Sequence, residues 1–165
     1  MKKSSKANKW LWIISTLLAI IVIGFLLAPS NGHDFEVDGI CYKVVDDVSN
    51  AVKVTYKGGD WTAFEHEYSG VVAIPKELTY KDVNYIVEQI DADAFRGCSK
   101  ITSISIPESV WCVGNGAFGG CDGLKEIHIN DLSAWCELSF NDVADDAGDS
   151  PLNYADGLYL NGELI

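Results

Sequence analysis

Hydrophobic and polar positions recur along residues 90–130 at an offset of 23 residues. Eight positions match when the segment is shifted by this offset, and they share the template I/V-x3-A-F-x-G-C-x2-I/L-x2-I-x-I: Ile90/Val113, Ala94/Ala117, Phe95/Phe118, Gly97/Gly120, Cys98/Cys121, Ile101/Leu124, Ile104/Ile127 and Ile106/Ile129. A single unit of this length cannot bury its apolar side, whereas stacked units create a continuous core. The pattern therefore predicts a solenoid of stacked coils.

The apolar spacing L-x2-L-x-L within this template is typical of a leucine-rich repeat, whose usual length is about 20–29 residues. We expect Ile104 and Ile106 to face the core from a short strand and Ser105 to face away, because side chains alternate along a strand. The Ala-Phe pairs fill the return side of each coil. Gly97 and Gly120 suit the tight turns that follow. The expected fold class is α/β to mostly β.

Shorter alternating runs precede the repeats. Asp38-Gly39 separates two such runs within residues 34–45, which predicts a β-hairpin, and residues 51–56 predict a third strand. The first coil, which begins at Val72-x-Ile74-Pro75, is nine residues longer than the next, and the surplus around 79–85 is consistent with an inserted hairpin. We therefore predict an N-terminal β cap, residues 34–70, followed by leucine-rich repeats, residues 71–130.

The repeat register loosens in residues 131–165. Residues 132–140 are apolar and aromatic, and Asn161-Gly162 predicts a hairpin turn whose second strand has only three residues before the sequence stops. We interpret this part as an irregular repeat, either truncated or completed by a partner.

Residues 1–30 are set apart from the predicted fold. Four lysines precede position 10, and Trp10 to Ala28 is an uncharged, nearly all-apolar run. Such a run is long for a secretory signal peptide and close to the length of a transmembrane helix. We favour an uncleaved anchor, with cleavage after Ser30 as the alternative. Either way, the remainder of the chain is expected to be exported, because the positive end stays inside.

The exported part is strongly acidic. The formal net charge of the 165-residue chain is −12, and all 24 acidic residues follow position 33. This balance argues against a nucleic acid or an anionic membrane as partner, since both attract basic patches. It fits a soluble surface facing outward.

The repeats resemble the BspA-like leucine-rich repeats of bacterial surface proteins. The family's AF-x-GC-x2-L-x2-I-x-I-P-x-S-V pattern is met by Ala94 to Val110, and again by Ala117 to Leu132, where Asn130 stands in place of proline. The resemblance extends over nearly all of residues 34–165. It implies cell-surface display and adhesion to host matrix proteins or other cell-surface proteins. It implies no catalytic residue, metal or cofactor.

The candidate chemistry outside the repeats is sparse. The five cysteines show no C-x2-C zinc spacing, and the acidic segment 141–150 lacks the spacing of a calcium loop. Cys98 and Cys121, at the same repeat position, are close enough for a disulfide, but we favour two small buried hydrophobic side chains. A histidine beside a cysteine would be needed for a thiol-dependent enzyme, and no flanking signature supports one.

Three functional hypotheses remain. The leading one is a non-enzymatic binding or adhesion module whose exposed sheet face carries Ser103, Ser105, Glu126 and His128. The second is a membrane-tethered spacer or remnant without its own ligand, and the third is the thiol-dependent enzyme. Trp111 and Trp135 lie 24 positions apart; we favour core packing over an exposed aromatic strip for them.

Overall fold

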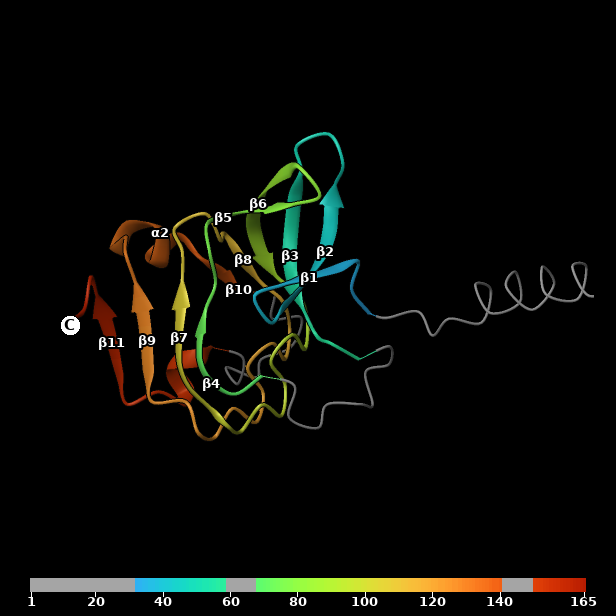
Figure 1. Ribbon diagram of the computed structural model, residues 1–165. Helices are drawn as coiled ribbons and strands as arrows, with labels where there is room; N and C mark the ends of the chain where they lie inside the picture. Colours follow the sequence, from blue (N-terminus) through green and yellow to red (C-terminus); the bar gives the residue numbers. More distant parts are fainter. Residues whose placement is uncertain (1–31, 59–67, 141–149) are drawn as a thin grey trace, which may run out of the picture. The chain divides into compact units, whose positions relative to one another are not determined.

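The computed structural model describes residues 32–58, 68–140 and 150–165, which form two β-sheets around a shared hydrophobic core (Figure 1). The elements in chain order are β1 (Phe35–Val37), β2 (Ile40–Asp46), β3 (Ala51–Thr55), β4 (Gly70–Ala73), β5 (Glu77–Tyr80), β6 (Val83–Ile90), β7 (Ile101–Ile106), β8 (Cys112–Val113), β9 (Glu126–Ile129), α2 (Leu132–Glu137), β10 (Ser139–Phe140), η2 (Pro151–Asn153), β11 (Gly157–Leu160) and β12 (Glu163–Leu164). The described fold is mostly β.

The chain alternates between the two sheets as it coils. The five-stranded sheet has the order β12-β11-β9-β7-β4, and β4, β7, β9 and β11 run parallel (Figure 1). The seven-stranded sheet has the order β1-β2-β3-β6-β8-β10, with β5 paired to β6, and β3, β6, β8 and β10 run parallel. Each coil adds one strand to each sheet, so the predicted solenoid is confirmed.

Residues at the predicted repeat offset are direct neighbours in space. Ile104 pairs with Ile127 between β7 and β9. Both are fully buried, and the Phe95 and Phe118 rings stack with their centroids 5.3 Å apart on the return side. The matched positions therefore build the core, as the sequence predicted.

Turn residues with positive φ close the coils and hairpins. Gly97 and Gly120 have φ angles of 69° and 73° at equivalent turns. The hairpin turn Asp38-Gly39 also takes positive φ at both residues, as the preferred two-residue hairpin turn requires. The same holds for Lys81-Asp82 between β5 and β6, which confirms the inserted hairpin, and for Asn161-Gly162 between β11 and β12.

The N-terminal strands extend the seven-stranded sheet and are fastened to the first coil by Tyr68. Its hydroxyl donates to the carbonyl oxygen of Thr55 at 2.6 Å and accepts from the Cys41 backbone N–H at 3.1 Å. Its ring meets Phe95 edge-on, 5.0 Å between centroids. The cap and the repeats consequently share one core.

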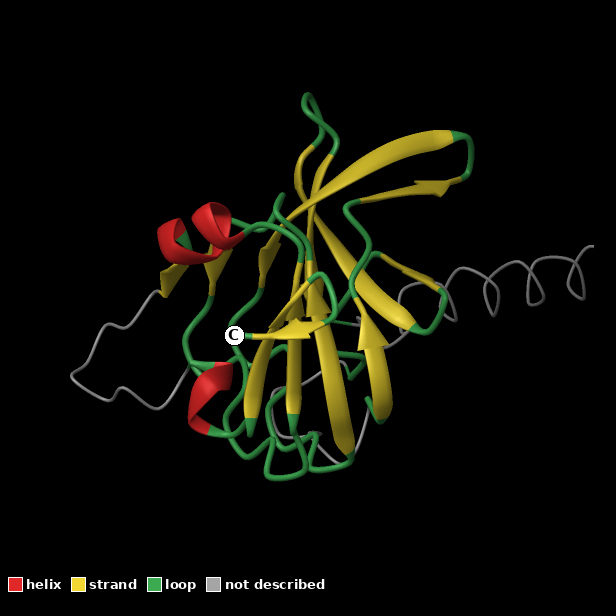
Figure 2. Cartoon of the chain, turned by 90° about the vertical axis from the view of Figure 1, so that its left-hand side faces the viewer, coloured by secondary structure: helices red, strands yellow, loops and turns green. Residues whose placement is uncertain are grey.

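The segment after β9 contains a short helix that the apolar pattern did not indicate. Asp131 caps α2, its carboxylate accepting from the backbone N–H groups of Ser133 and Ala134. β10 then pairs in parallel with β8. The irregular segment therefore still completes a coil, with its two helical segments at the periphery (Figure 2).

Two expectations about aromatic and sulfur side chains have different outcomes. Trp111 is 53% exposed, so its assignment to the core was wrong, whereas Trp135 is partly buried against the core. Cys98 and Cys121 are both buried in the core cluster. The Cys121 thiol donates to the carbonyl oxygen of Phe95 at 3.1 Å, in agreement with the favoured interpretation as a small buried side chain.

Some expectations fall outside the described residues, namely those on the transmembrane or signal helix of residues 1–30 and on most of the acidic segment 141–150. Within the described ranges, no helix is both long and apolar enough to cross a membrane.

Candidate functional site

One side of the five-stranded sheet is directed away from the core, and we call it the outer face. Alternation along four parallel strands assigns to it Val71, Ala73, Ser103, Ser105, Glu126, His128, Gly157 and Tyr159. These positions form two cross-strand ladders. One ladder consists of Ala73, Ser105, His128 and Tyr159. The other consists of Val71, Ser103, Glu126 and Gly157. The sheet thus brings all four predicted binding residues together.

One of the four predicted residues is not exposed. Ser103 is only 7% exposed, because its short side chain lies between the larger neighbours Val71 and Glu126 on the adjacent strands. Ser105, Glu126 and His128 are partly exposed. The prediction that Ser103 is available at the surface was therefore wrong.

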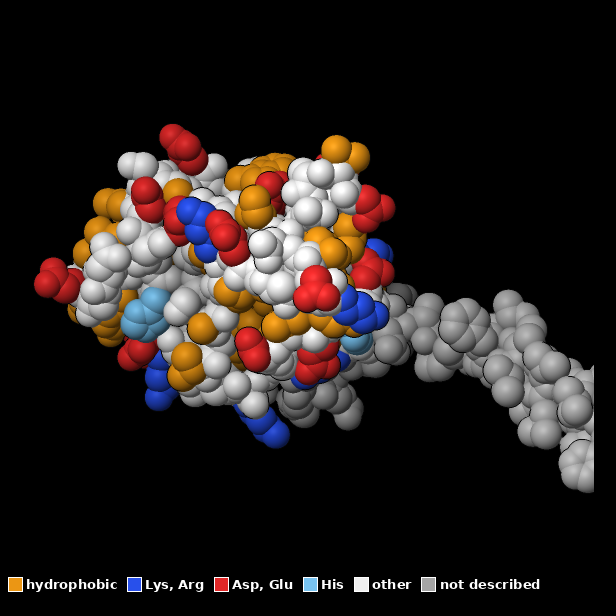
Figure 3. Space-filling view, turned by 45° about the horizontal axis from the view of Figure 1, so that its top comes forward, with side chains coloured by type: hydrophobic (Ala, Val, Ile, Leu, Met, Phe, Trp, Pro, Cys, Tyr) orange, Lys and Arg blue, Asp and Glu red, His pale blue; other side chains and the backbone are white. Residues whose placement is uncertain are grey.

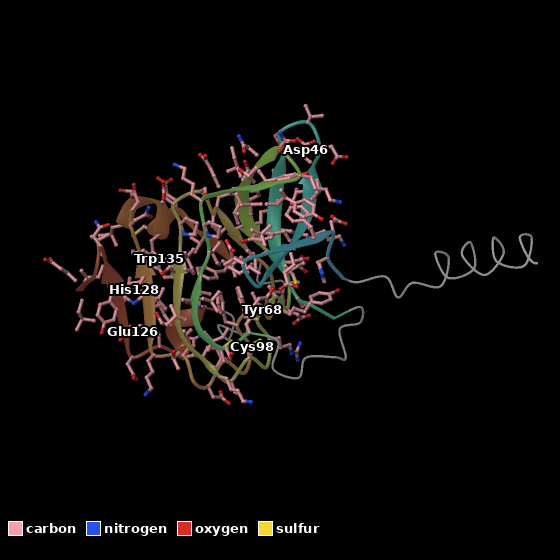
Figure 4. The ribbon with its side chains drawn as sticks, in the orientation of Figure 1. Asp46, Tyr68, Cys98, Glu126, His128 and Trp135 are labelled. Atoms are coloured by element: carbon pink, nitrogen blue, oxygen red, sulfur yellow. The ribbon has the colours of Figure 1, made fainter. Side chains whose placement is uncertain are left out.

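Glu126, His128 and Tyr159 form the most ordered part of the outer face. His128 Nε2 lies 3.1 Å from Glu126 Oε2, two residues away along β9 (Figure 4). The imidazole stacks on the Tyr159 ring of β11, with centroids 4.9 Å apart and an interplanar angle of 23°. These contacts fix the imidazole plane between a carboxylate and an aromatic ring.

A shallow groove of about 420 Å³ adjoins the outer face at the carboxyl ends of its strands. Glu108 lies in it, with Oε1 2.8 Å from Lys76 Nζ and Oε2 accepting a hydrogen bond from the Asn130 side-chain amide. Asn130 is the residue that replaces the proline of the repeat pattern. Asn130 therefore links its own coil to the preceding coil through the Glu108 carboxylate.

Glu108 is held as a carboxylate. Its hydrogen bonds from Lys76 and Asn130 lower its pKa to about 2. Both of its oxygens are engaged, so it is ill suited to transfer protons at neutral pH. The groove offers hydrogen-bonding groups in fixed positions, with His128 and Asn161 also on its wall.

Replacing Glu108 by Gln should flatten the acid dependence of stability. The pKa of Glu108 is about 2 in the folded state against an ordinary value of 4.5. Its contribution to stability is therefore complete above the ordinary value and is lost as the pH falls through the folded value. Urea unfolding at about pH 5 and about pH 2 should show a smaller loss for E108Q than for the wild type. Equal losses would contradict the pairing, and K76M should change the dependence in the same direction as E108Q.

Thiol chemistry has little support at the buried cysteines. Burial, followed by the influence of Cys98, raises the pKa of the Cys121 thiol to about 12. Burial also raises the pKa of Cys112. A reactive cysteine needs a lowered pKa and access to solvent, so these two side chains are poor nucleophiles.

Tyr159, Lys76 and Glu108 were missed in the sequence. Tyr159 lies outside the repeat template, and only the register of β11 against β9 places it beside His128. Lys76 and Glu108 each follow an Ile-x-Ile-Pro or Val-x-Ile-Pro segment, so their shared position just after the strand was the available signal.

On the face drawn in Figure 3, the acidic side chains are dispersed rather than gathered into one patch. Figure 3 shows them across the visible face, interspersed with apolar side chains and with several Lys or Arg. This distribution gives the described surface no single strongly charged region on that face.

Comparison with solved structures finds similar leucine-rich repeat proteins. A leucine-rich cell surface protein from Faecalibacterium prausnitzii A2-165 is 24% identical, with a TM-score of 0.47 over 63% of this chain and 25% of that one. A leucine-rich repeat protein from Bacteroides ovatus is 28% identical, with a TM-score of 0.44 over 66% of this chain and 34% of that one. A third, from Bacteroides capillosus, is 20% identical, with a TM-score of 0.47 over 76% of this chain and 96% of that one. This chain thus spans only a quarter to a third of the first two proteins.

A search of curated proteins gave no match. The comparison with family models gave a direct one. The family model described as 'BspA type Leucine rich repeat region (6 copies)' matches residues 75–144 of this chain. The resemblance drawn from the AF-x-GC template is therefore confirmed over residues 75–144, which match the repeat model of the BspA type.

Proposed function

We propose that this chain is an exported recognition module that binds a protein partner on the outer face of its five-stranded sheet. The partner is a host matrix protein or a protein on another cell. No catalytic step is part of the proposal.

The observation that carries the proposal is the stacked set of Glu126, His128 and Tyr159. These side chains are partly exposed and occupy positions that the repeat leaves variable, since β7 has Ser105 where β9 has His128. The core is built by the matched positions and does not need them. Tyrosine is among the side chains that dominate binding energy at protein interfaces, and Tyr159 is held here by its stack on His128.

The size of the outer face favours weak binding per molecule. The four parallel strands of the outer face, each occupying about 4.8 Å, span roughly 20 Å, and four residues along a strand span about 13 Å. The resulting area of about 250 Å² is well below the roughly 800 Å² that each partner contributes to a standard interface. Many copies on one surface would compensate, because linked binding events gain effective concentration.

The sequence of residues 1–30 supports the exported location. A lysine-rich start followed by the apolar run from Trp10 to Ala28 is what a membrane anchor or signal requires. An anchored chain would also provide the many copies that weak binding needs.

Beads that carry the full chain at high density should retain at least one member of a panel of matrix proteins and whole cells. Retention should fall steeply, rather than in proportion, as the number of copies per bead is lowered, because the interaction depends on avidity. Absence of retention at every density would contradict recognition and would favour a spacer without a ligand.

A further inference from the structure

Three metal-ligating side chains meet at the β1–β2 hairpin, away from the outer face. His33 precedes β1, Glu36 lies in β1, and Cys41 lies in β2 directly opposite Glu36. One ligand atom of each, a ring nitrogen, a carboxylate oxygen and the sulfur, lies within 4.8 Å of the other two. The cross-strand register brings the second and third together, and the short connection from His33 brings the first.

The polar atoms of this cluster are arranged toward one another. Cys41 is fully buried, and its Sγ lies 4.0 Å from Glu36 Oε2. The other carboxylate oxygen of Glu36 is 3.3 Å from Lys57 Nζ. His33 Nδ1 is buried and has no hydrogen-bond partner among the described residues, which is costly for a polar atom unless something else coordinates it.

We propose that His33, Glu36 and Cys41 bind a zinc-type divalent transition-metal ion. Imidazole nitrogen and thiolate sulfur select zinc and its borderline neighbours over calcium and magnesium, which prefer all-oxygen sites. Three protein ligands leave a fourth position for water. Ligand atoms around tetrahedral zinc are about 3.3–3.5 Å apart, so the side chains need to close in by roughly 1 Å.

Metal binding is expected to cross-link the N-terminal hairpin. The ion would join both strands of the hairpin to the segment that precedes β1. Because a ligand that binds only the folded state raises the free energy of unfolding by RT ln(1 + [L]/Kd), zinc should stabilise the described domain. This site is separate from the outer face, so its presence does not depend on the proposed recognition function.

Cobalt(II) is the probe of choice, because a thiolate ligand gives it a charge-transfer band that oxygen or nitrogen ligands do not. The reduced full chain in detergent should bind one cobalt ion, show this near-ultraviolet band together with tetrahedral d–d bands, and lose both when zinc is added. C41S should abolish the charge-transfer band, and H33A should weaken zinc binding more than about 10-fold.

Two variants serve as matched controls. C136S removes an exposed thiol and H128S removes a histidine of the outer face, and both should leave the cobalt spectrum unchanged. E36Q keeps the size of a side chain that is 46% exposed, so it should fold normally while binding zinc more weakly. Thermal unfolding of each metal-free variant reports whether it folds. A cobalt spectrum without the charge-transfer band in the wild type, or unchanged in E36Q, would overturn the site.

Discussion

Replacement of Phe118 by Ala is expected to cost about 3–5 kcal/mol of unfolding free energy, the usual loss for a buried phenylalanine. Phe118 is 1% exposed and stacks on Phe95 of the preceding coil at 5.3 Å. The substitution removes the apolar contact and leaves a cavity between two coils that cannot collapse independently. A loss of this size would remove a large fraction of the stability of an ordinary domain.

Urea unfolding followed by circular dichroism measures this loss. Val48 is 92% exposed, so V48A serves as the control and should change the free energy by no more than about 0.5 kcal/mol. A Phe118→Ala loss as small as that of V48A would show that the coils are not held together by their aromatic stack.

Replacement of Gly123 by Ala is expected to cost about 1–3 kcal/mol, the range for overpacking. A Cβ atom at this position would overlap the carbonyl oxygen of Ser99 and lie 3.1 Å from that of Ile101, both in the neighbouring coil. These are backbone atoms, so the coils themselves would have to separate.

Gly119→Ala is the matched control for this close approach. Its Cβ would lie 3.3 Å from the Gly116 carbonyl oxygen and 3.7 Å from the flexible Arg96 side chain, which is a milder contact. Thermal and urea unfolding should therefore show that G123A is clearly less stable than G119A. The opposite order would mean that coil spacing is not set by the glycine at position 123.

The repeat pattern was sufficient to predict the solenoid and its core. Ile104 and Ile127 were matched by offset alone, and they are paired neighbours because parallel strands in successive coils keep the same register. The Asp38-Gly39 and Asn161-Gly162 hairpins were predictable for a local reason, since both residues of such turns take positive φ.

The surface was less predictable, because exposure depends on neighbours from other strands. Ser103 and Ser105 lie on the same face of β7, yet only Ser103 is covered, between Val71 and Glu126. Tyr159 belongs to a segment with no match to the template, so its stacking on His128 required the structure.

The His33, Glu36 and Cys41 cluster was missed for a similar reason. Sequence patterns for zinc rely on pairs of ligands at short fixed spacing. Here Glu36 and Cys41 are five residues apart and meet only because a two-residue turn pairs them across the hairpin. The hairpin itself was predicted, so its cross-strand pairs were the available signal.

The most direct test of recognition by the outer face is retention by dense beads carrying the double variant H128S/Y159A. His128→Ser installs on β9 the side chain that β7 carries at the equivalent position, so the coil geometry is kept. W111A is the control, because Trp111 is an exposed aromatic residue beside the other sheet. We expect the double variant to lose retention and W111A to keep it. Full retention by the double variant, or loss only in W111A, would contradict binding at the outer face.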